Sequence, residues 1–230
     1  MPAITSRNRI LVVCLLAVAV LALQPAGALG GNSNPGIHPP TSNPYGLSYT
    51  EWSVRWWQWA LSIPASQNPL LDPDGTFCHV GQSGHVFFLG SNGGGANVRS
   101  CAIDTGQSVL FVAGGAICIL SLSVDTEAEL QPCVEDALPQ FTVVSADVDG
   151  RPVQDIDSYL VELTPLFTFT LPADNLFGAP AGEYRARAGN WILMTPPLSA
   201  GQHVIHFHDE VPANGFVSDV TYDLIVGPHH

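Results

Sequence analysis

The sequence predicts a mainly β protein: a β-sandwich of jelly-roll or immunoglobulin-like kind, with one N-terminal, tryptophan-rich helix packed on it. Two observations lead to this prediction. Between Thr76 and Val226 the chain carries ten short β-type runs, separated by turns rich in Gly, Pro, Asn and Asp. Ahead of these runs, one stretch repeats its apolar residues with helical spacing.

The helix is predicted to run from Tyr49 to Ser62. Ser48 and Glu51 have the spacing of a capping box, in which each side chain bonds to the backbone N–H of the other residue. Pro64 predicts the end of the helix, because the residue before a proline is pushed out of the α region.

Four tryptophans make this helix apolar around most of its circumference. They are interpreted either as a platform on which sugars stack or as an aromatic plug in the core, and the plug is favoured because clustered tryptophans are usually buried. Glu51 and Arg55 are spaced i, i+4 and most simply form a pair on the helix surface. If the helix instead lines a site, the candidate ligand-binding residues are Glu51, Arg55, Trp57 and Gln58.

Residues 1–29 are predicted to be a signal peptide. Arg7 and Arg9 precede the apolar run from Ile10 to Leu23, and small residues ending at Ala28 offer a cleavage site. An uncleaved membrane anchor is the alternative. No later stretch reaches eighteen apolar residues, so no integral membrane segment is expected in the mature chain. The expected location is secreted or periplasmic.

The mature chain is predicted to form one domain. Residues 30–47 are rich in Gly, Pro, Asn and Ser with almost nothing to bury, which predicts a flexible leader. A single β-sandwich domain is expected over residues 48–226, followed by a tail at 227–230. About 200 residues are enough for one well-formed core.

The charge balance excludes some partners. The chain has 20 acidic residues against 7 basic ones, all of them Arg, for a net charge of −13. Such an acidic protein is not expected to bind nucleic acid or an anionic membrane. A composition that is 46% hydrophobic and 12% charged also argues against disorder and coiled coil.

The cysteines predict two disulfides. Removal of Cys14 with the signal leaves an even number of cysteines in an oxidising compartment. Three pairings are possible, and Cys78–Cys101 with Cys118–Cys133 is favoured because each bond then ties neighbouring β segments. A zinc site is the alternative, but the chain has no C-x-x-C pair.

The C-terminal part of the chain contains candidate metal ligands. In the segment HVIHFHDE, His206 and His208 share one face of a strand and Glu210 is a candidate third ligand for a transition metal. If Ile205 and Phe207 point to the core, the two histidines are ordinary solvated side chains instead.

Calcium is a second candidate ion, because aspartates cluster at 147, 149, 155 and 157 and flank a turn at Asp72 and Asp74. Ordinary turns on an acidic surface are favoured over calcium sites. The sequence therefore predicts no resident cofactor.

Two segments carry a resemblance. YTEWSVRWWQW, with Glu51, Trp52 and Arg55, and the C-terminal motif PLSAGQHVI, with Gly201 and His203, resemble a family of uncharacterised, secreted, β-rich bacterial proteins. The resemblance implies an exported location and a β-rich fold, and it implies no activity.

No complete catalytic motif is present. GQSGH at Gly81 to His85 departs from the G-x-S-x-G nucleophile motif at its last position. The sequence favours a secreted, non-catalytic binding or structural protein of unknown extracellular ligand, for which a polysaccharide or the cell envelope is the candidate. The alternative is a secreted metal-dependent or glycan-acting enzyme.

Overall fold

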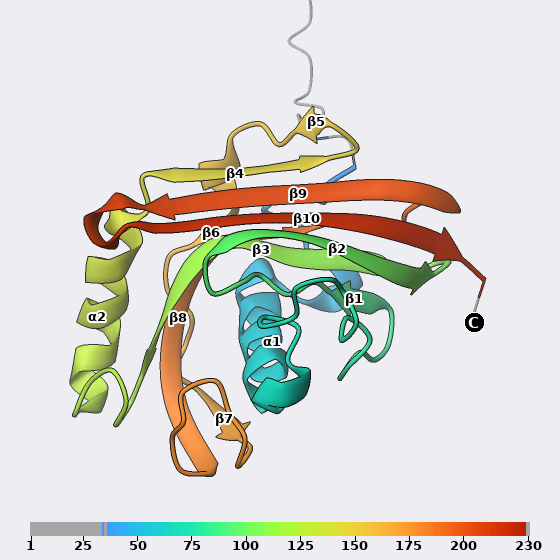
Figure 1. Cartoon of the computed structure of the whole chain (residues 1–230). Helices are drawn as coiled ribbons and strands as arrows, with labels where there is room; N and C mark the ends of the chain where they lie inside the picture. The colour runs from blue at the N-terminus through green and yellow to red at the C-terminus, as the bar shows by residue number, and fades with distance from the viewer. Residues whose placement is uncertain (1–33, 35, 229–230) are drawn as a thin grey trace, which may run out of the picture. The chain divides into compact units, whose positions relative to one another are not determined.

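The computed structural model describes residue 34 and residues 36–228. These residues form a mainly β structure with two five-stranded sheets and two α-helices (Figure 1). The predicted signal peptide, residues 1–29, lies outside the described residues. None of the helices in the described part of the chain is long and apolar enough to cross a membrane.

The first sheet, called here the β9 sheet, has the strand order β2-β10-β9-β4-β5 (Figure 1). β10 pairs antiparallel with β9 and parallel with β2. Burial along β9 alternates as a strand with one solvated face requires, so that Ile205 and Phe207 point inward and Val204 is exposed. The strands of this sheet are β2 (Gly95–Asp104), β4 (Val143–Val148), β5 (Arg151–Pro152), β9 (Gly201–Val211) and β10 (Phe216–Gly227).

The second sheet, called here the β8 sheet, has the order β1-β3-β8-β6, and β7 also pairs with β8. β8 is long enough to pair with β7 over its first residues and with β6 near its end. β1 pairs parallel with β3, whereas β3 and β8 are antiparallel. The strands are β1 (Val86–Phe88), β3 (Ser108–Ile119), β6 (Leu160–Val161), β7 (Phe167–Leu171) and β8 (Gly182–Met194).

The two sheets meet through β3, whose side chains contact β9. Phe111 of β3 stacks on Phe207 of β9, with ring centroids 5.6 Å apart and an interplanar angle of 19°. Both rings are fully buried. Offset aromatic stacking of this kind adds to the burial of apolar area, so this pair is a central contact of the core.

Helix α1 spans Tyr49–Ser62, the residues that the sequence predicts. The capping box is present: the Ser48 hydroxyl accepts a hydrogen bond from the Glu51 N–H, and the Glu51 carboxylate accepts one from the Ser48 N–H. The helix packs against β7 and β8 (Figure 1). All four of its tryptophans are buried, which supports the interpretation of the helix as an aromatic plug.

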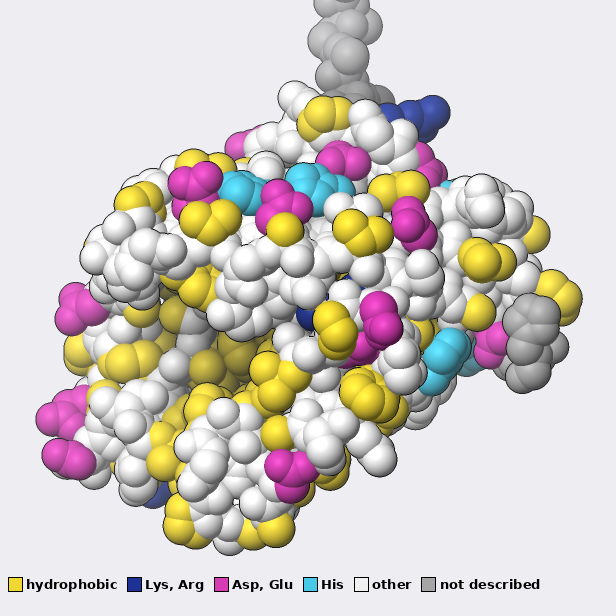
Figure 2. All heavy atoms as spheres, in the orientation of Figure 1, with side chains coloured by type: hydrophobic (Ala, Val, Ile, Leu, Met, Phe, Trp, Pro, Cys, Tyr) yellow, Lys and Arg dark blue, Asp and Glu magenta, His cyan; other side chains and the backbone are white. Residues whose placement is uncertain are grey.

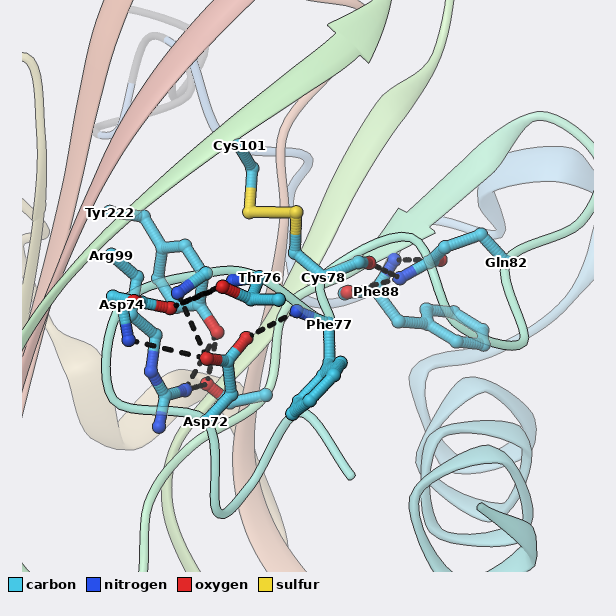
Figure 3. The surroundings of a disulfide bond; sticks show 12 residues. Asp72, Asp74, Thr76, Phe77, Cys78, Gln82, Phe88, Arg99, Cys101 and Tyr222 are labelled. Carbon is cyan, nitrogen blue, oxygen red and sulfur yellow. Dashed lines mark hydrogen bonds between the residues drawn. A yellow bond between two sulfur atoms is a disulfide. The ribbon is translucent and has the colours of Figure 1, made fainter. Parts of the chain in front are cut away.

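Helix α2 spans Leu130–Ala137 and packs against β3 and β8. The second disulfide, Cys118–Cys133, joins this helix to β3. The first, Cys78–Cys101, joins the loop before β1 to β2 (Figure 3). Both pairings are those that the sequence favoured.

The prediction of a flexible leader is wrong for the part of residues 30–47 that the structure describes. Ile37 is buried in the core, and the His38 N–H donates a hydrogen bond to the Met194 carbonyl. The Asn34 side chain bonds to both the N–H and the carbonyl of Gln154. One isoleucine and a few backbone hydrogen bonds are enough to anchor a segment whose composition resembles that of a linker.

The first of the ten predicted strands is also absent. Residues 77–80 form turns, because the segment is held by the disulfide at Cys78 and by hydrogen bonds of Asp72 to the surrounding backbone.

Candidate functional site

A cleft of about 290 Å³ opens between α1, the end of α2, β3 and the β9–β10 turn. Figure 2 shows a hollow with hydrophobic side chains inside it, between the positions of α1 and α2 in Figure 1. The cleft is lined by Trp56, Trp57, Ser91, Asn92, Val112, Gly114, Gly115, Ala137, Gln140, Phe141, Asp209, Val211, Asn214 and Phe216.

Two adjacent glycines of β3 leave the space that the cleft occupies. The pairing of β3 with β8 shifts register between Val112 and Gly114, which is the signature of a β-bulge. A methyl group on Gly115 would lie 2.4 Å from the Cβ of Asn190, so this position admits no side chain. The bulge and the two glycines together keep this part of β3 free of side chains, whereas the flanking residues of β3 fill the core.

Asp209 is the one ionisable side chain among the described residues that line the cleft. It lies on the inward face of β9, in step with Ile205 and Phe207, and only 4% of it is exposed. Burial raises the pKa of the Asp209 carboxyl to about 6, and its neighbours Ser218 and His208 oppose this only in part. Above that pH, the cleft therefore holds a carboxylate in apolar surroundings.

The aromatic wall of the cleft is formed by Trp56 and Trp57, which meet edge to face with ring centroids 4.9 Å apart. The Trp56 indole N–H donates to the Leu89 carbonyl at 2.9 Å. Trp57 is only 8% exposed, and its buried indole nitrogen has no hydrogen-bond partner among the described residues. An unpaired donor in a buried wall is costly and marks a place where the fold does not satisfy its own polar groups.

The opposite wall is held by α2. A capping box of Thr126 and Glu129 starts the 3₁₀ turn that leads into the helix, and Cys133 ties the helix to Cys118 of β3. Ala137, at the end of α2, faces the cleft. The position of this wall thus depends on a covalent bond to the strand that forms the floor.

The structure does not bring the four predicted ligand-binding residues together. The Glu51 carboxylate caps α1, Arg55 lies over the Trp52 ring at 5.2 Å, and Gln58 donates to the Thr168 carbonyl at 2.8 Å. Only Trp57 lines the cleft. Arg55 and Gln58 line a separate groove beside Trp52, because side chains of one helix diverge to different neighbours.

The predicted metal ligands His206, His208 and Glu210 all lie on the outward face of β9. Figure 2 shows histidines and carboxylates together over this sheet. His206 contacts Asp147 at 3.0 Å and Asp219 at 3.2 Å, and His208 contacts Glu210 at 3.0 Å. No group of three His, Cys, Asp or Glu side chains among the described residues is arranged to hold a metal ion.

The clustered aspartates have structural roles. The Asp72 carboxylate accepts hydrogen bonds from the backbone N–H groups of Asp74, Gly75 and Phe77 in a loop next to the first disulfide (Figure 3). Asp149 pairs with His203 at 2.8 Å. Asp157 accepts a hydrogen bond from the Trp191 indole. These contacts agree with the interpretation of the aspartates as turn and surface residues.

Sequence reasoning did not single out Asp209, although a signal was present. Ile205, Phe207 and Asp209 have the same strand parity, so any argument that sends the two apolar residues inward also buries the carboxylate. A carboxylate on the core face of a strand is a candidate functional group, since buried charges are rare without a partner.

Comparisons with known proteins give no family. No protein-family model and no curated protein matches the chain. One solved chain, from a structure described as PbICP-C in complex with falcipain-2, is 10% identical, with 63% of this chain and all of that chain covered and a TM-score of 0.27. The solution structure of amebosin is 12% identical over the same shares, with a TM-score of 0.19. At these TM-scores, neither likeness carries an argument about fold or function.

Proposed function

We propose that the protein is a non-catalytic binding module that holds a small organic molecule in the cleft between α1 and α2. The observation that carries this proposal is the presence of a buried carboxylate, Asp209, inside a cleft with aromatic walls. Ligand sites are typically concave and largely apolar, with a few polar groups that fix the orientation of the ligand. At about 290 Å³ the cleft suits a molecule of one or two rings.

Binding is favoured over catalysis because Asp209 has no chemical partner in the cleft. General acid–base or nucleophilic catalysis needs a second group of complementary role within hydrogen-bond reach. The other described polar residues lining the cleft are Ser91, Asn92, Gln140 and Asn214, and none of them is a base. The enzyme alternative is therefore retained only as an outcome of the test below.

A site in the cleft is favoured over a sugar-stacking platform on α1. Stacking of a sugar requires an open aromatic face, but Trp52, Trp56 and Trp59 are all buried within the core. The polysaccharide interpretation would have to use the groove beside Arg55 and Gln58, in which the lining tryptophans Trp52 and Trp59 are themselves buried.

We further propose that the chain is exported and that its fold is a sandwich of the jelly-roll or immunoglobulin-like class. Two disulfides support an oxidising compartment, and the Phe111–Phe207 stack between the sheets supports the sandwich. The parallel pairs β1–β3 and β2–β10 depart from the purely antiparallel form of those folds. We also propose, from the two sequence segments that resemble them, that the chain is related to uncharacterised secreted bacterial proteins.

The test of the binding proposal uses the protein in solution with indole, 2-phenylethanol, glucose and N-acetylglucosamine as probes. Ligand-observed NMR should detect binding of the ring compounds, and Ala137→Trp, which fills the cleft from the end of α2, should abolish it. Ser66→Trp, a change at an exposed residue of the 3₁₀ turn Ala65–Gln67 that does not line the cleft, is the control and should leave binding intact. Binding of the sugars alone, or binding that survives Ala137→Trp, would overturn the proposal; conversion of a probe would indicate an enzyme.

A further inference from the structure

The cleft contains a negative charge that the described residues lining it do not balance. None of those residues is Arg, Lys or His, while Asp209 is almost entirely buried. A buried carboxylate is costly unless a cation or several hydrogen bonds stabilise it. Two neighbours outside the lining, Ser218 and His208, offset the effect of burial on the pKa of the Asp209 carboxyl only in part. The alternation of β9 directs the His208 ring to the opposite face of the sheet, toward Glu210 and Asp219.

The aromatic residues of the cleft also favour a positively charged ligand. Trp57, Phe141 and Phe216 line the cleft beside the fully buried Trp56, and aromatic rings attract cations through their quadrupole. The combination of aromatic rings with a single carboxylate is suited to an organic cation, because the rings cover its apolar part and the carboxylate binds its charged head.

The neutral side chains at the cleft and the net charge of the whole chain also favour a cationic ligand. Asn92, Gln140 and Asn214 offer neutral amides at the cleft, so no fixed positive charge repels a cation there. The whole chain has a formal net charge of −13, which raises the local concentration of cations and lowers that of anions.

We propose that the ligand of the cleft is a small amine carried on an aromatic or aliphatic body, with its ammonium group bound by the Asp209 carboxylate. This inference rests on the proposed function and specifies its ligand class. It predicts discrimination between molecules of the same shape that differ only in charge.

The experiment is titration calorimetry at pH 7.5 with three probes of similar size: 2-phenylethylamine, 2-phenylethanol and 3-phenylpropanoate. The amine should bind at least about tenfold more tightly than the alcohol, and the carboxylate should bind least. Asp209→Asn, which keeps the shape of the side chain, should weaken binding of the amine by about thirtyfold or more and leave the alcohol within about threefold.

Glu210→Gln is the matched control. It removes one negative charge from the neighbouring residue of the same strand, but on the opposite face of the sheet, and should change binding of the amine by less than about threefold. Ala137→Trp provides a second variant that blocks the cleft without touching Asp209. Circular dichroism of each variant checks that it is folded.

The outcomes separate the two proposals. If the alcohol binds as well as the amine and Ala137→Trp abolishes both, the cleft is a ligand site but the assignment of an amine is wrong. If Asp209→Asn binds the amine as tightly as the wild type, the assignment is also wrong. If none of the three probes binds the wild type, both this assignment and the proposal of a site for small ring compounds fail.

Discussion

Asp209 of β9 and Gly114 of β3 face each other across the space between the two sheets: a methyl group on Gly114 would lie 3.1 Å from the Cβ of Asp209. The absence of a side chain at Gly114 is what leaves room for a carboxylate in this part of the core. The fold therefore tolerates a buried carboxylate at this position, and the cost in the free energy of unfolding is measurable.

Asp209→Asn should stabilise the protein at alkaline pH. The pKa of Asp209 is raised in the folded state to about 6 from 3.8, so folding is opposed by ionisation, and the penalty grows as the pH rises through this window. Relative to the wild type, the variant should gain about 3 kcal/mol at pH 8 and only about 1 kcal/mol at pH 4.5. Urea denaturation at the two pH values measures this. A gain that is equal at both would show that Asp209 does not titrate as described, and Glu210→Gln is the control.

Trp56→Phe and Trp57→Phe should differ in stability although they are adjacent. Trp56→Phe removes the donor to the Leu89 carbonyl and leaves it buried, which costs about 2 kcal/mol or more. Trp57→Phe removes a buried N–H that has no partner among the described residues, so the loss of ring volume is offset and the net change should stay within about 1 kcal/mol. Chemical denaturation of both variants checks the difference; an equal loss would contradict the hydrogen-bond assignment.

The double variant Cys118→Ser/Cys133→Ser should lose about 3 kcal/mol, as expected for a loop in which the cysteines are 15 residues apart. Because this bond holds α2 against β3, hydrogen exchange should also rise in the segment from Ala137 to Phe141, next to the cleft. Removal of Cys78 and Cys101 is the comparison. It should destabilise the protein without a selective increase in that segment, and an equal increase in both variants would show that the effect is not specific to the disulfide of α2.

The protein, purified without a chelator or affinity tag and truncated after Val226, should carry no stoichiometric transition metal. His206 and His208 already contact Asp147, Asp219 and Glu210 at hydrogen-bond distance, and no group of three such side chains in the described residues is arranged to hold a metal ion. Elemental analysis checks this. About one zinc, copper, nickel or iron per chain, lost in His206→Ala/His208→Ala, would overturn the prediction and favour a metal-dependent enzyme.

Local features of the fold could be predicted from the sequence because they depend on neighbouring residues. The start of α1 is specified by Ser48 and Glu51, three residues apart, and the disulfide Cys118–Cys133 joins segments that are close along the chain. The inward and outward faces of β9 also follow from simple alternation.

The candidate site could not be predicted because it depends on contacts between distant segments. A helix that is apolar on most sides does not reveal which side meets which neighbour, so its sequence alone does not separate Trp57, which lines the cleft, from Arg55 and Gln58, which line another groove. The role of Asp209 depends on Gly114, which belongs to a strand of the other sheet. Only the three-dimensional arrangement joins these residues.

The parallel pairing of β2 with β10 has a consequence for the order in which the chain can fold. Over its whole length, from Gly95 to Asp104, β2 pairs with the last strand of the described chain, Ser218 to Gly227. No hairpin can form this contact, so β2 lacks its partner until the ribosome has made the more than one hundred residues that lead to Gly227. A nascent chain that cannot complete one of its sheets early leaves a strand edge unpaired for longer, and an unpaired edge exposes the chain to aggregation until β10 is available.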